Sequence, residues 1–283
     1  MNDGPEIVAR SLTVARVEPY KYGNSWQYHS RSDRHSKIAC WGILFDLLRR
    51  SALMRAHVET RKAVFGVNHQ MRDYKTGRKK NLDLVVARPA NGAGKVEFAD
   101  LVDHYDVVLT DGQRSELEAL PPAEIAPVGS VLMALEAKAC MTEHVKARPR
   151  LYDELNSSHL TVHGASRQAI AVGFVMVNLS STFVSPDLNK FTISETSPAV
   201  ITTHSQPRVT ESVIEKLREI PRRSAPSEEG FDALGIVVVE CANDGTPVAI
   251  VKGSPAPSSD DIHHYDRMID RVQHMYEVTF KDI

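Results

Sequence analysis

The sequence lacks the features that mark several common classes of protein. It contains no run of 18 or more apolar residues, so it shows no pattern of a transmembrane helix. Its first thirty residues include Asp3, Glu6 and Arg10 and lack the apolar stretch of a secretory signal. We therefore expect a cytoplasmic protein without a membrane partner.

Cysteine is scarce, and motifs for cofactor chemistry are missing. Cys40, Cys140 and Cys241 are odd in number and widely spaced, which fits neither a disulfide framework nor a zinc site, so we predict reduced thiols. Glycine-rich phosphate loops and the Gly-x-Ser-x-Gly elbow are absent. The histidines do not suggest a histidine-metal nuclease. We expect no organic cofactor.

The composition itself is ordinary, but its charge is unevenly distributed. With 42 % hydrophobic and 25 % charged residues, the 283-residue chain can bury a full core. The formal net charge is −2, yet residues 51–80 carry eight basic and two acidic side chains, whereas residues 90–128 carry eight acidic and two basic ones. Such runs are either solvated faces or, for the basic one, a docking segment for nucleic acid.

The apolar spacing alternates between helical and strand periods along the chain. It predicts helices over 37–56 with Ser36 as N-cap, 113–120, 142–156, 210–220 and from Ser258 or Ser259 to 276. It predicts strands within 57–88 and over 131–140, 169–178, 234–241 and 247–251. No long linker divides these elements. We expect one α/β domain over residues 1–283, with an N-terminal arm (1–36) and an acidic insertion (90–128).

The most informative segment is the apolar strand over 131–140. Because strand side chains alternate, Glu136 and Lys138 share one face while apolar residues line the other. A buried charge costs several kcal/mol unless a partner or a metal compensates it, so this pair calls for an explanation. The simple alternative is an ion pair at an exposed strand end. A second apolar strand, 79–87, carries a single acid, Asp83.

Asp83, Glu136 and Lys138 together have the chemistry for hydrolysing a phosphodiester. Mg²⁺ prefers one or two carboxylates plus waters and phosphate oxygens, so two acids on neighbouring strands can share one ion. An ammonium group beside the ion can orient the attacking water or offset the charge that develops on the phosphate. Without a metal, the two carboxylates would repel each other.

In these residues the chain resembles the PD-(D/E)XK nucleases, whose best-known members are type II restriction endonucleases. Glu136-Ala137-Lys138 matches the second half of their motif, and Asp83 at the start of an apolar strand matches the first. The resemblance implies a restriction-endonuclease-like α/β fold, with a mixed central β-sheet flanked by helices. It implies Asp83 and Glu136 as Mg²⁺ ligands and Lys138 as the group that assists the water. A Mg²⁺-dependent endonuclease of duplex DNA, homodimeric and serving restriction-modification or phage defence, would follow.

The sequence departs from the family pattern at two points. Leu82 replaces the proline that usually precedes the first acid. The 53 positions from Asp83 to Glu136 exceed the usual separation and require residues 90–128 to be an insertion between the two motif strands. Asp111, 25 positions before Glu136, therefore remains an alternative metal-binding acid.

Basic residues near the motif are candidates for contacting DNA phosphates. They are Arg31, Arg34, Lys79, Lys80, Lys146, Arg148 and Arg150. Arg31 and Arg34 belong to a polar stretch with Asp33 and His35, which either contacts substrate or caps the following helix. Two other functions stay open. One is a non-catalytic nucleic-acid-binding or assembly protein that docks through residues 51–80, and the other is a nuclease acting on RNA or single strands.

Overall fold

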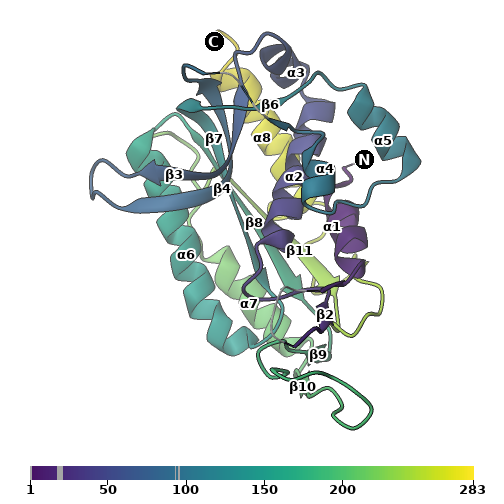
Figure 1. The fold of residues 1–283 in the computed structure, drawn as a ribbon. Helices are drawn as coiled ribbons and strands as arrows, with labels where there is room; N and C mark the ends of the chain where they lie inside the picture. The colour runs from purple at the N-terminus through teal and green to yellow at the C-terminus, as the bar shows by residue number, and fades with distance from the viewer. Residues whose placement is uncertain (1, 18–21, 93, 95) are drawn as a thin grey trace.

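The computed structural model describes residues 2–17, 22–92, 94 and 96–283. Within these residues the centre is a mixed eight-stranded sheet with helices on both faces (Figure 1). In sheet order the strands are β12 (Ala249–Ile250), β11 (Ala233–Glu240), β8 (Ile170–Asn178), β7 (Val128–Cys140), β4 (Lys79–Pro89), β3 (Val64–Arg72), β6 (Glu124–Ile125) and β5 (Val96–Glu97). The expectation of an α/β fold with a mixed central sheet flanked by helices is confirmed.

The middle of the sheet is parallel, and the β3–β4 hairpin joins it antiparallel. β8 pairs in parallel with β7 and with β11, whereas β4 pairs antiparallel with β7 and with β3. Every residue of β8 is buried. This explains its nearly continuous apolar sequence, because a central parallel strand is covered on both faces.

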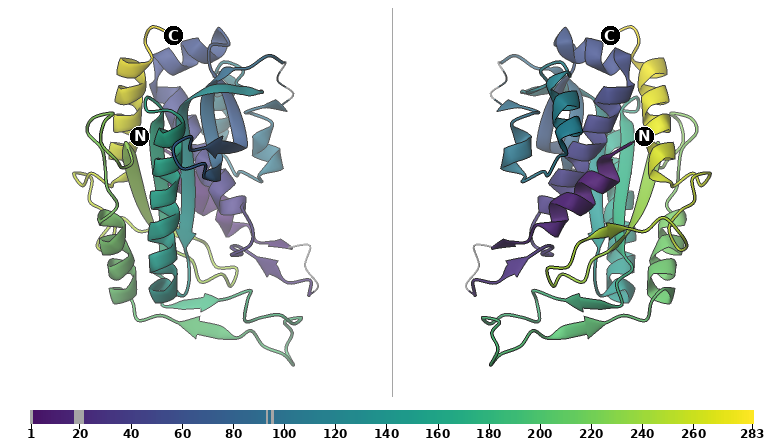
Figure 2. Two further views of the ribbon diagram at one scale, coloured as in Figure 1. Left: turned by 90° about the vertical axis from the view of Figure 1, so that its left-hand side faces the viewer. Right: turned by 90° about the vertical axis from the view of Figure 1, so that its right-hand side faces the viewer.

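The helices form two layers that enclose the sheet (Figure 2). One apolar cluster joins the sheet to α1 (Gly4–Thr13), α2 (Arg34–Arg50), α3 (Ala52–Glu59) and α8 (Tyr265–Thr279). The other cluster joins the opposite face to α6 (His144–Ala165) and α7 (Arg208–Arg218). Two short ribbons lie outside the sheet: β1 (Arg16–Val17) with β2 (Ser25–Trp26), and β9 (Thr182–Val184) with β10 (Ile201–Thr203).

The segment between β4 and β7 is built into the edge of the sheet. β4 and β7 are neighbours in the sheet although some 40 residues separate them in the chain. The intervening residues supply β5 and β6, which extend the sheet beyond β3, and the helices α4 (Leu101–His104) and α5 (Asp111–Glu118). Thr110 caps α5 through a capping box with Gln113, which explains why the helix begins before the predicted residue 113.

Several predicted helix boundaries were wrong. α2 begins at Arg34, so Ser36 lies in its first turn and is not its N-cap. Ser51 accepts a hydrogen bond from the Met54 backbone and starts α3, which divides the predicted 37–56 helix in two. α6 continues through Pro149 to Ala165, and α8 begins at Tyr265. The helix α1 in the N-terminal arm was not predicted.

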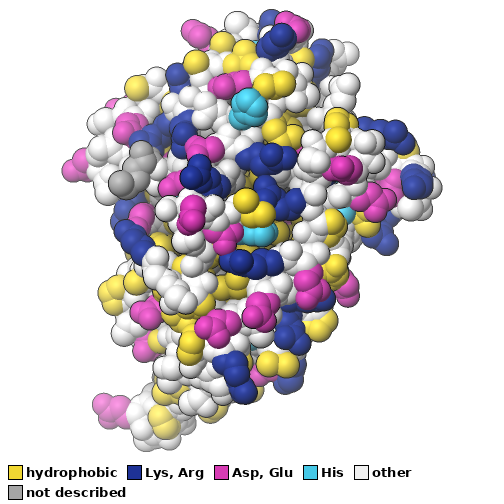
Figure 3. All heavy atoms as spheres, turned by 180° about the vertical axis from the view of Figure 1, so that it is seen from behind, with side chains coloured by type: hydrophobic (Ala, Val, Ile, Leu, Met, Phe, Trp, Pro, Cys, Tyr) yellow, Lys and Arg dark blue, Asp and Glu magenta, His cyan; other side chains and the backbone are white. Residues whose placement is uncertain are grey.

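The remaining expectations about core and surface can be compared directly with the structure. Cys40, Cys140 and Cys241 are free and buried, as predicted for reduced thiols. In the described parts of the chain, no helix combines the length and the apolar character needed to cross a membrane. Side chains of both charge signs are interspersed over the face shown in Figure 3. That face therefore offers no broad basic surface.

Candidate active site

The motif residues meet where β4 and β7 separate. The two strands pair from Pro89 and Val128 up to Leu84 and Leu135. Beyond that point β4 remains paired with β3, and β7 remains paired with β8. Asp83 and Glu136 are the next residues on each strand, so the strands diverge at the two acids. In Figure 1 the β3–β4 hairpin leans away from β7 at this level.

The Asp83 carboxylate bridges the start of this gap. The backbone N–H of Ala137 donates a hydrogen bond of 2.8 Å to Asp83 Oδ2. A side-chain oxygen thus accepts a hydrogen bond from a peptide N–H at the point where the backbone hydrogen bonds between β4 and β7 stop. This contact fixes the Asp83 carboxylate directly beside Glu136, despite the 53 positions between the two acids.

Glu136 is a buried carboxylate with one satisfied oxygen. It is 1 % exposed, and its Oε1 lies 2.7 Å from Lys138 Nζ and 3.4 Å from Lys80 Nζ. Its Oε2 is buried and has no hydrogen-bond partner among the described residues. The alternative of an ion pair at an exposed strand end is therefore wrong for this pair. A buried carboxylate oxygen left unsatisfied is costly, and a bound cation would remove that cost.

A second lysine and a further acid complete the cluster. Lys80 Nζ donates a 2.6 Å hydrogen bond to the backbone carbonyl of Glu154 on α6, which holds it beside Glu136. The Glu154 side chain lies 3.8 Å from Lys138 Nζ and 3.2 Å from Arg150 Nε. Glu154 was not among the predicted site residues, although its position four residues after Arg150 suits an ion pair on a helix. Lys80 was predicted to contact DNA, and it lies within the site instead.

The pKa values in the cluster follow from burial and from the neighbouring charges. Burial, followed by the charge of Glu136, raises the pKa of Asp83 to about 6. Burial also lowers the pKa of Lys80. For Lys138 the effect of burial is outweighed by Glu136 and Asp83, so its pKa lies above the ordinary value. At neutral pH the cluster thus holds a cationic Lys138. Beside it lies Asp83, whose raised pKa of about 6 is close to neutral pH.

The start of α2 brings a neutral imidazole toward the cluster. Burial, then the charge of Lys138, lowers the pKa of His35 to about 4. The His35 ring packs against Tyr28, with 5.0 Å between the ring centroids. The polar stretch of the arm therefore comes near Lys138, and His35 lies there without a positive charge at neutral pH.

The two candidates for the first acid are placed very differently. Asp83 lies next to Glu136, whereas Asp111 is the exposed first residue of α5 in the insertion. The same first turn of that helix contacts α1 through Gln113, which accepts a hydrogen bond from Arg10. Of the two acids, only Asp83 is brought to Glu136 by the strand pairing.

The predicted DNA-contacting residues fall into three groups. Lys79, Lys146 and Arg150 are exposed, and Arg148 is partly exposed beside the last two on α6. Arg31 is exposed and forms an ion pair with Asp187 at 3.1 Å. Arg34 donates to the backbone carbonyls of Ser11 and Val14 and so holds the end of α1 against α2. It therefore has a structural role that the sequence did not indicate.

The acid pair meets the modest requirements of magnesium. In the described residues, no group of three or more His, Cys, Asp or Glu side chains is arranged to hold a metal. Mg²⁺ does not need such a group, because waters and substrate phosphates complete its shell around one or two carboxylates. Asp83 and Glu136 supply those two carboxylates, and the unsatisfied Oε2 of Glu136 fits a cation ligand.

Two histidines that the sequence analysis passed over lie near the other end of α6. His159 and His163 are one turn apart, and His163 Nε2 lies 3.2 Å from Asp232 Oδ2. Asp232 is already engaged by Arg223 Nε and by the backbone N–H of Ala171, both at 2.7 Å. This group is consistent with a buried structural network that ties α6 to β8 and β11.

Comparison with protein-family models, with curated proteins and with solved structures finds no match for this chain. The arrangement of Asp83, Glu136, Lys80 and Lys138 is therefore the basis for assigning chemistry to the protein. That arrangement offers two acidic oxygen ligands and two ammonium groups at one opening in the sheet. Its chemistry suits a substrate that brings negative charge of its own.

Proposed function

We propose that the protein is a Mg²⁺-dependent endonuclease that hydrolyses phosphodiester bonds in duplex DNA, with a site similar to that of the PD-(D/E)XK nucleases. One observation carries the proposal. Asp83 and Glu136 adjoin at the divergence of two strands, with Lys138 Nζ 2.7 Å from a buried glutamate whose second oxygen has no partner among the described residues. A role in restriction or phage defence belongs to the same proposal and depends on the resemblance.

Each residue has a separate task in this proposal. Asp83 and Glu136 would hold Mg²⁺, which supplies a Lewis acid for a phosphoryl oxygen and lowers the pKa of bound water. Lys138 stays protonated, because its pKa is raised, and can stabilise the negative charge that grows on the phosphate. Lys80 also lies against the first oxygen of Glu136 and leaves the second one available.

The surroundings of the site offer cationic positions for the DNA backbone. Lys79 lies one residue before Lys80 on the hairpin. Lys146, Arg148 and Arg150 lie within the first half of α6. Phosphate contacts of this kind supply most of the sequence-independent affinity for DNA. They would hold the duplex across the outer surface of the hairpin and the first half of α6, with a phosphate at Lys138.

A cleavage assay tests the proposal. Supercoiled plasmid is incubated with the protein and Mg²⁺, with and without a chelator, and linear duplex, single-stranded DNA and RNA are run alongside. We expect Mg²⁺-dependent nicking or linearisation, and a loss of rate of about 10²-fold or more for Lys138→Ala, which removes charge stabilisation at the phosphate. DNA affinity should change little, and the variant should stay folded at the assay temperature although it melts lower, because Glu136 loses its nearest cation; circular dichroism melting checks this.

Lys252→Ala is the matched control, because Lys252 is an exposed lysine whose ion pair with Glu6 lies outside the cluster. It should cut like the unmodified protein. If Lys138→Ala also cuts normally, the site assignment is wrong. Binding with a steep salt dependence and no cleavage under any metal condition would favour a non-catalytic nucleic-acid-binding protein. Cleavage of only RNA or single strands would show that duplex DNA is the wrong substrate, and the proposed phosphodiester hydrolysis would still hold.

A further inference from the structure

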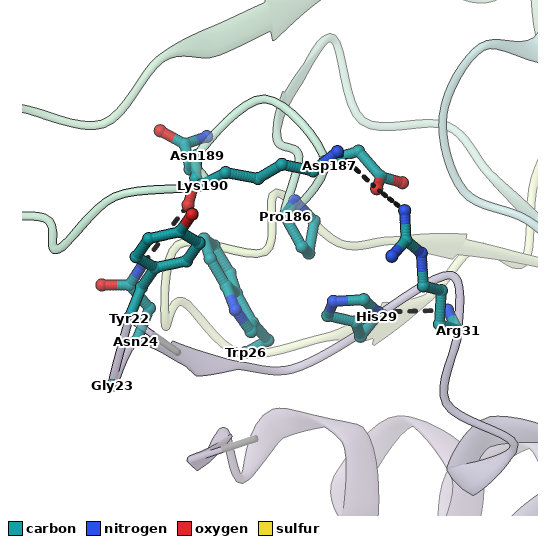
Figure 4. Close-up of a pocket in the computed structure, with 10 residues that line it drawn as sticks. All are labelled: Tyr22, Gly23, Asn24, Trp26, His29, Arg31, Pro186, Asp187, Asn189 and Lys190. Atoms are coloured by element: carbon teal, nitrogen blue, oxygen red, sulfur yellow. Dashed lines mark hydrogen bonds and ion pairs between the residues drawn. The ribbon is translucent and has the colours of Figure 1, made fainter. Parts of the chain in front are cut away.

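A second candidate site lies in the N-terminal arm, apart from the acids. A pocket of about 160 Å³ opens between residues 22–31 and residues 186–190. Figure 4 shows the rings of Tyr22 and Trp26 coming from the arm, with Pro186 and Lys190 coming from the segment after β9. The Trp26 side chain is almost fully buried, at 6 % exposure, yet it lines this pocket.

The pocket is preformed, because hydrogen bonds join its two walls on both sides. On one side Asn24 Nδ2 donates to the Phe191 carbonyl at 2.8 Å, and Thr192 Oγ1 donates to the Tyr22 carbonyl at 3.1 Å. On the other side Ser30 Oγ donates to Asp187 at 3.0 Å, alongside the Arg31–Asp187 ion pair. A ligand therefore meets walls that need little ordering, which favours binding.

The lining indicates a flat aromatic ligand attached to negative charge. A cavity of about 150 Å³ is enough for one benzene-sized ring, so this pocket suits a single ring system. The aromatic side chains of Tyr22 and Trp26 line the pocket, and stacking on aromatic rings is favourable for every nucleobase. Arg31 and Lys190 stand at the rim with side chains 63 % and 57 % exposed, against the single acid Asp187. A phosphate next to the base would meet this excess of positive charge.

The pocket is also close to the candidate active site along the arm. Arg31 at its rim precedes His35 by four residues, so their Cα atoms are at most roughly 14 Å apart. The His35 ring contacts Tyr28, and the charge of Lys138 acts on His35. Burial raises the pKa of Tyr28, and the charge of Arg150 on α6 opposes that rise. The arm thus continues from the pocket to Tyr28 and His35, which are in ring contact and lie within the electrostatic influence of Arg150 and Lys138.

We propose that this pocket receives one nucleobase, unstacked from the strand that lies across the site, between Tyr22 and Trp26, with the adjoining phosphate near Arg31 and Lys190. The inference rests on the proposed function, because it takes the same nucleic acid as the ligand. It adds a contact to a base, which phosphate-binding side chains do not make. Removing a base from the stack costs a few kcal/mol, and stacking on aromatic side chains offsets this cost.

Tryptophan fluorescence can report on the pocket, because the protein has two tryptophans and Trp41 is 1 % exposed between Phe45 and Phe98. The Lys138→Ala protein, without Mg²⁺, is titrated with a short single-stranded oligothymidylate and with an abasic strand of equal length. We expect the base-bearing strand to quench the emission and the abasic strand to leave it nearly unchanged. Trp26→Phe should abolish the quenching, and Tyr22→Ala should weaken binding of the base-bearing strand about tenfold.

Circular dichroism melting of both variants confirms that they fold, and Tyr74→Ala, at a tyrosine 78 % exposed on the hairpin turn, controls for loss of any surface aromatic. Equal quenching by the abasic strand, or none by either strand, overturns the pocket proposal. The plasmid assay tests the proposed nuclease activity independently of this result. Quenching without cleavage would refute the nuclease proposal and support the base pocket. Cleavage without quenching would support the nuclease proposal and refute the base pocket.

Discussion

Asp83 illustrates how the surroundings of a single carboxyl set its chemistry. Burial and the adjacent Glu136 raise its pKa to about 6, whereas its ordinary value is 3.8. A metal ligand must be deprotonated, so protons compete with Mg²⁺ at this side chain. Under the proposed function this competition would take place around pH 6, the raised pKa of the carboxyl.

We predict that Mg²⁺ affinity rises with pH up to about 6 and levels off above it. Below the raised pKa, Asp83 is mostly protonated and each unit of pH costs up to about tenfold in affinity, whereas above it the carboxylate is fully available. Isothermal titration calorimetry between pH 5 and 8 measures this. Asp83→Asn should abolish binding, and Asp111→Asn, at the alternative acid, should leave it intact. An affinity that does not change with pH would contradict the assignment.

Glu136 permits a test that does not depend on catalysis. A cation that binds only the folded protein raises its melting temperature by mass action. We expect millimolar Mg²⁺ to raise the melting temperature of the unmodified protein and to leave that of Glu136→Gln unchanged. Without metal, Glu136→Gln should melt lower, because Lys80 and Lys138 lose their shared carboxylate in a partly buried place. A metal-induced shift that persists in Glu136→Gln would remove this residue from the metal site.

Among the elements, the turn end of the β3–β4 hairpin, beyond its pairing with β7, is held by its contact with α6. Arg78 Nη1 donates to Ser157, and the Tyr74 backbone N–H donates to the Gly164 carbonyl. A Cβ added to Gly164 would lie 2.1 Å from Asp73 Oδ1, inside the turn that ends β3. Because Lys80 follows this turn, its position beside Glu136 depends on the same packing.

Gly164→Ala should therefore destabilise the protein by about 1–3 kcal/mol, the usual cost of forcing an atom into a packed site. It should also reduce cleavage, because the hairpin carries Lys80 and Asp83. Gly112→Ala is the matched control, since nothing lies within 4 Å of its added Cβ and alanine favours the helix α5. That change should be neutral or stabilise by up to about 1 kcal/mol. Equal urea midpoints for the two variants would refute the packing argument.

For the whole molecule, the number of sites per chain sets an expectation about assembly. The described residues hold one cluster of the Asp83–Glu136–Lys138 kind, and cutting both strands of a duplex takes two such sites. We predict a homodimer on DNA, measured by sedimentation of the Lys138→Ala protein with a short duplex. Linear product should then rise more steeply than in proportion to protein concentration. A 1:1 complex that cuts both strands at once would contradict this prediction.

The sequence by itself determined the parts of the protein that depend on local pattern. Alternating apolar residues predicted β7 around Glu136 and Lys138, and a continuous apolar run predicted β8, because burial on one face leaves an alternating pattern and burial on both faces leaves a continuous one. The strands predicted over 234–241 and 247–251 correspond to β11 and β12, which pair antiparallel. The fold class followed from these elements and their order.

Tertiary structure decided which distant residues meet. Asp83 and Asp111 both precede Glu136, and only the pairing of β4 with β7 brings one of them beside it. The places of Lys80 and Glu154 depend on how the hairpin packs on α6, and the base pocket depends on Asn24 and Asp187 joining segments that lie far apart in the chain. Contacts of this kind have no fixed sequence spacing, because they arise from how whole elements pack against one another.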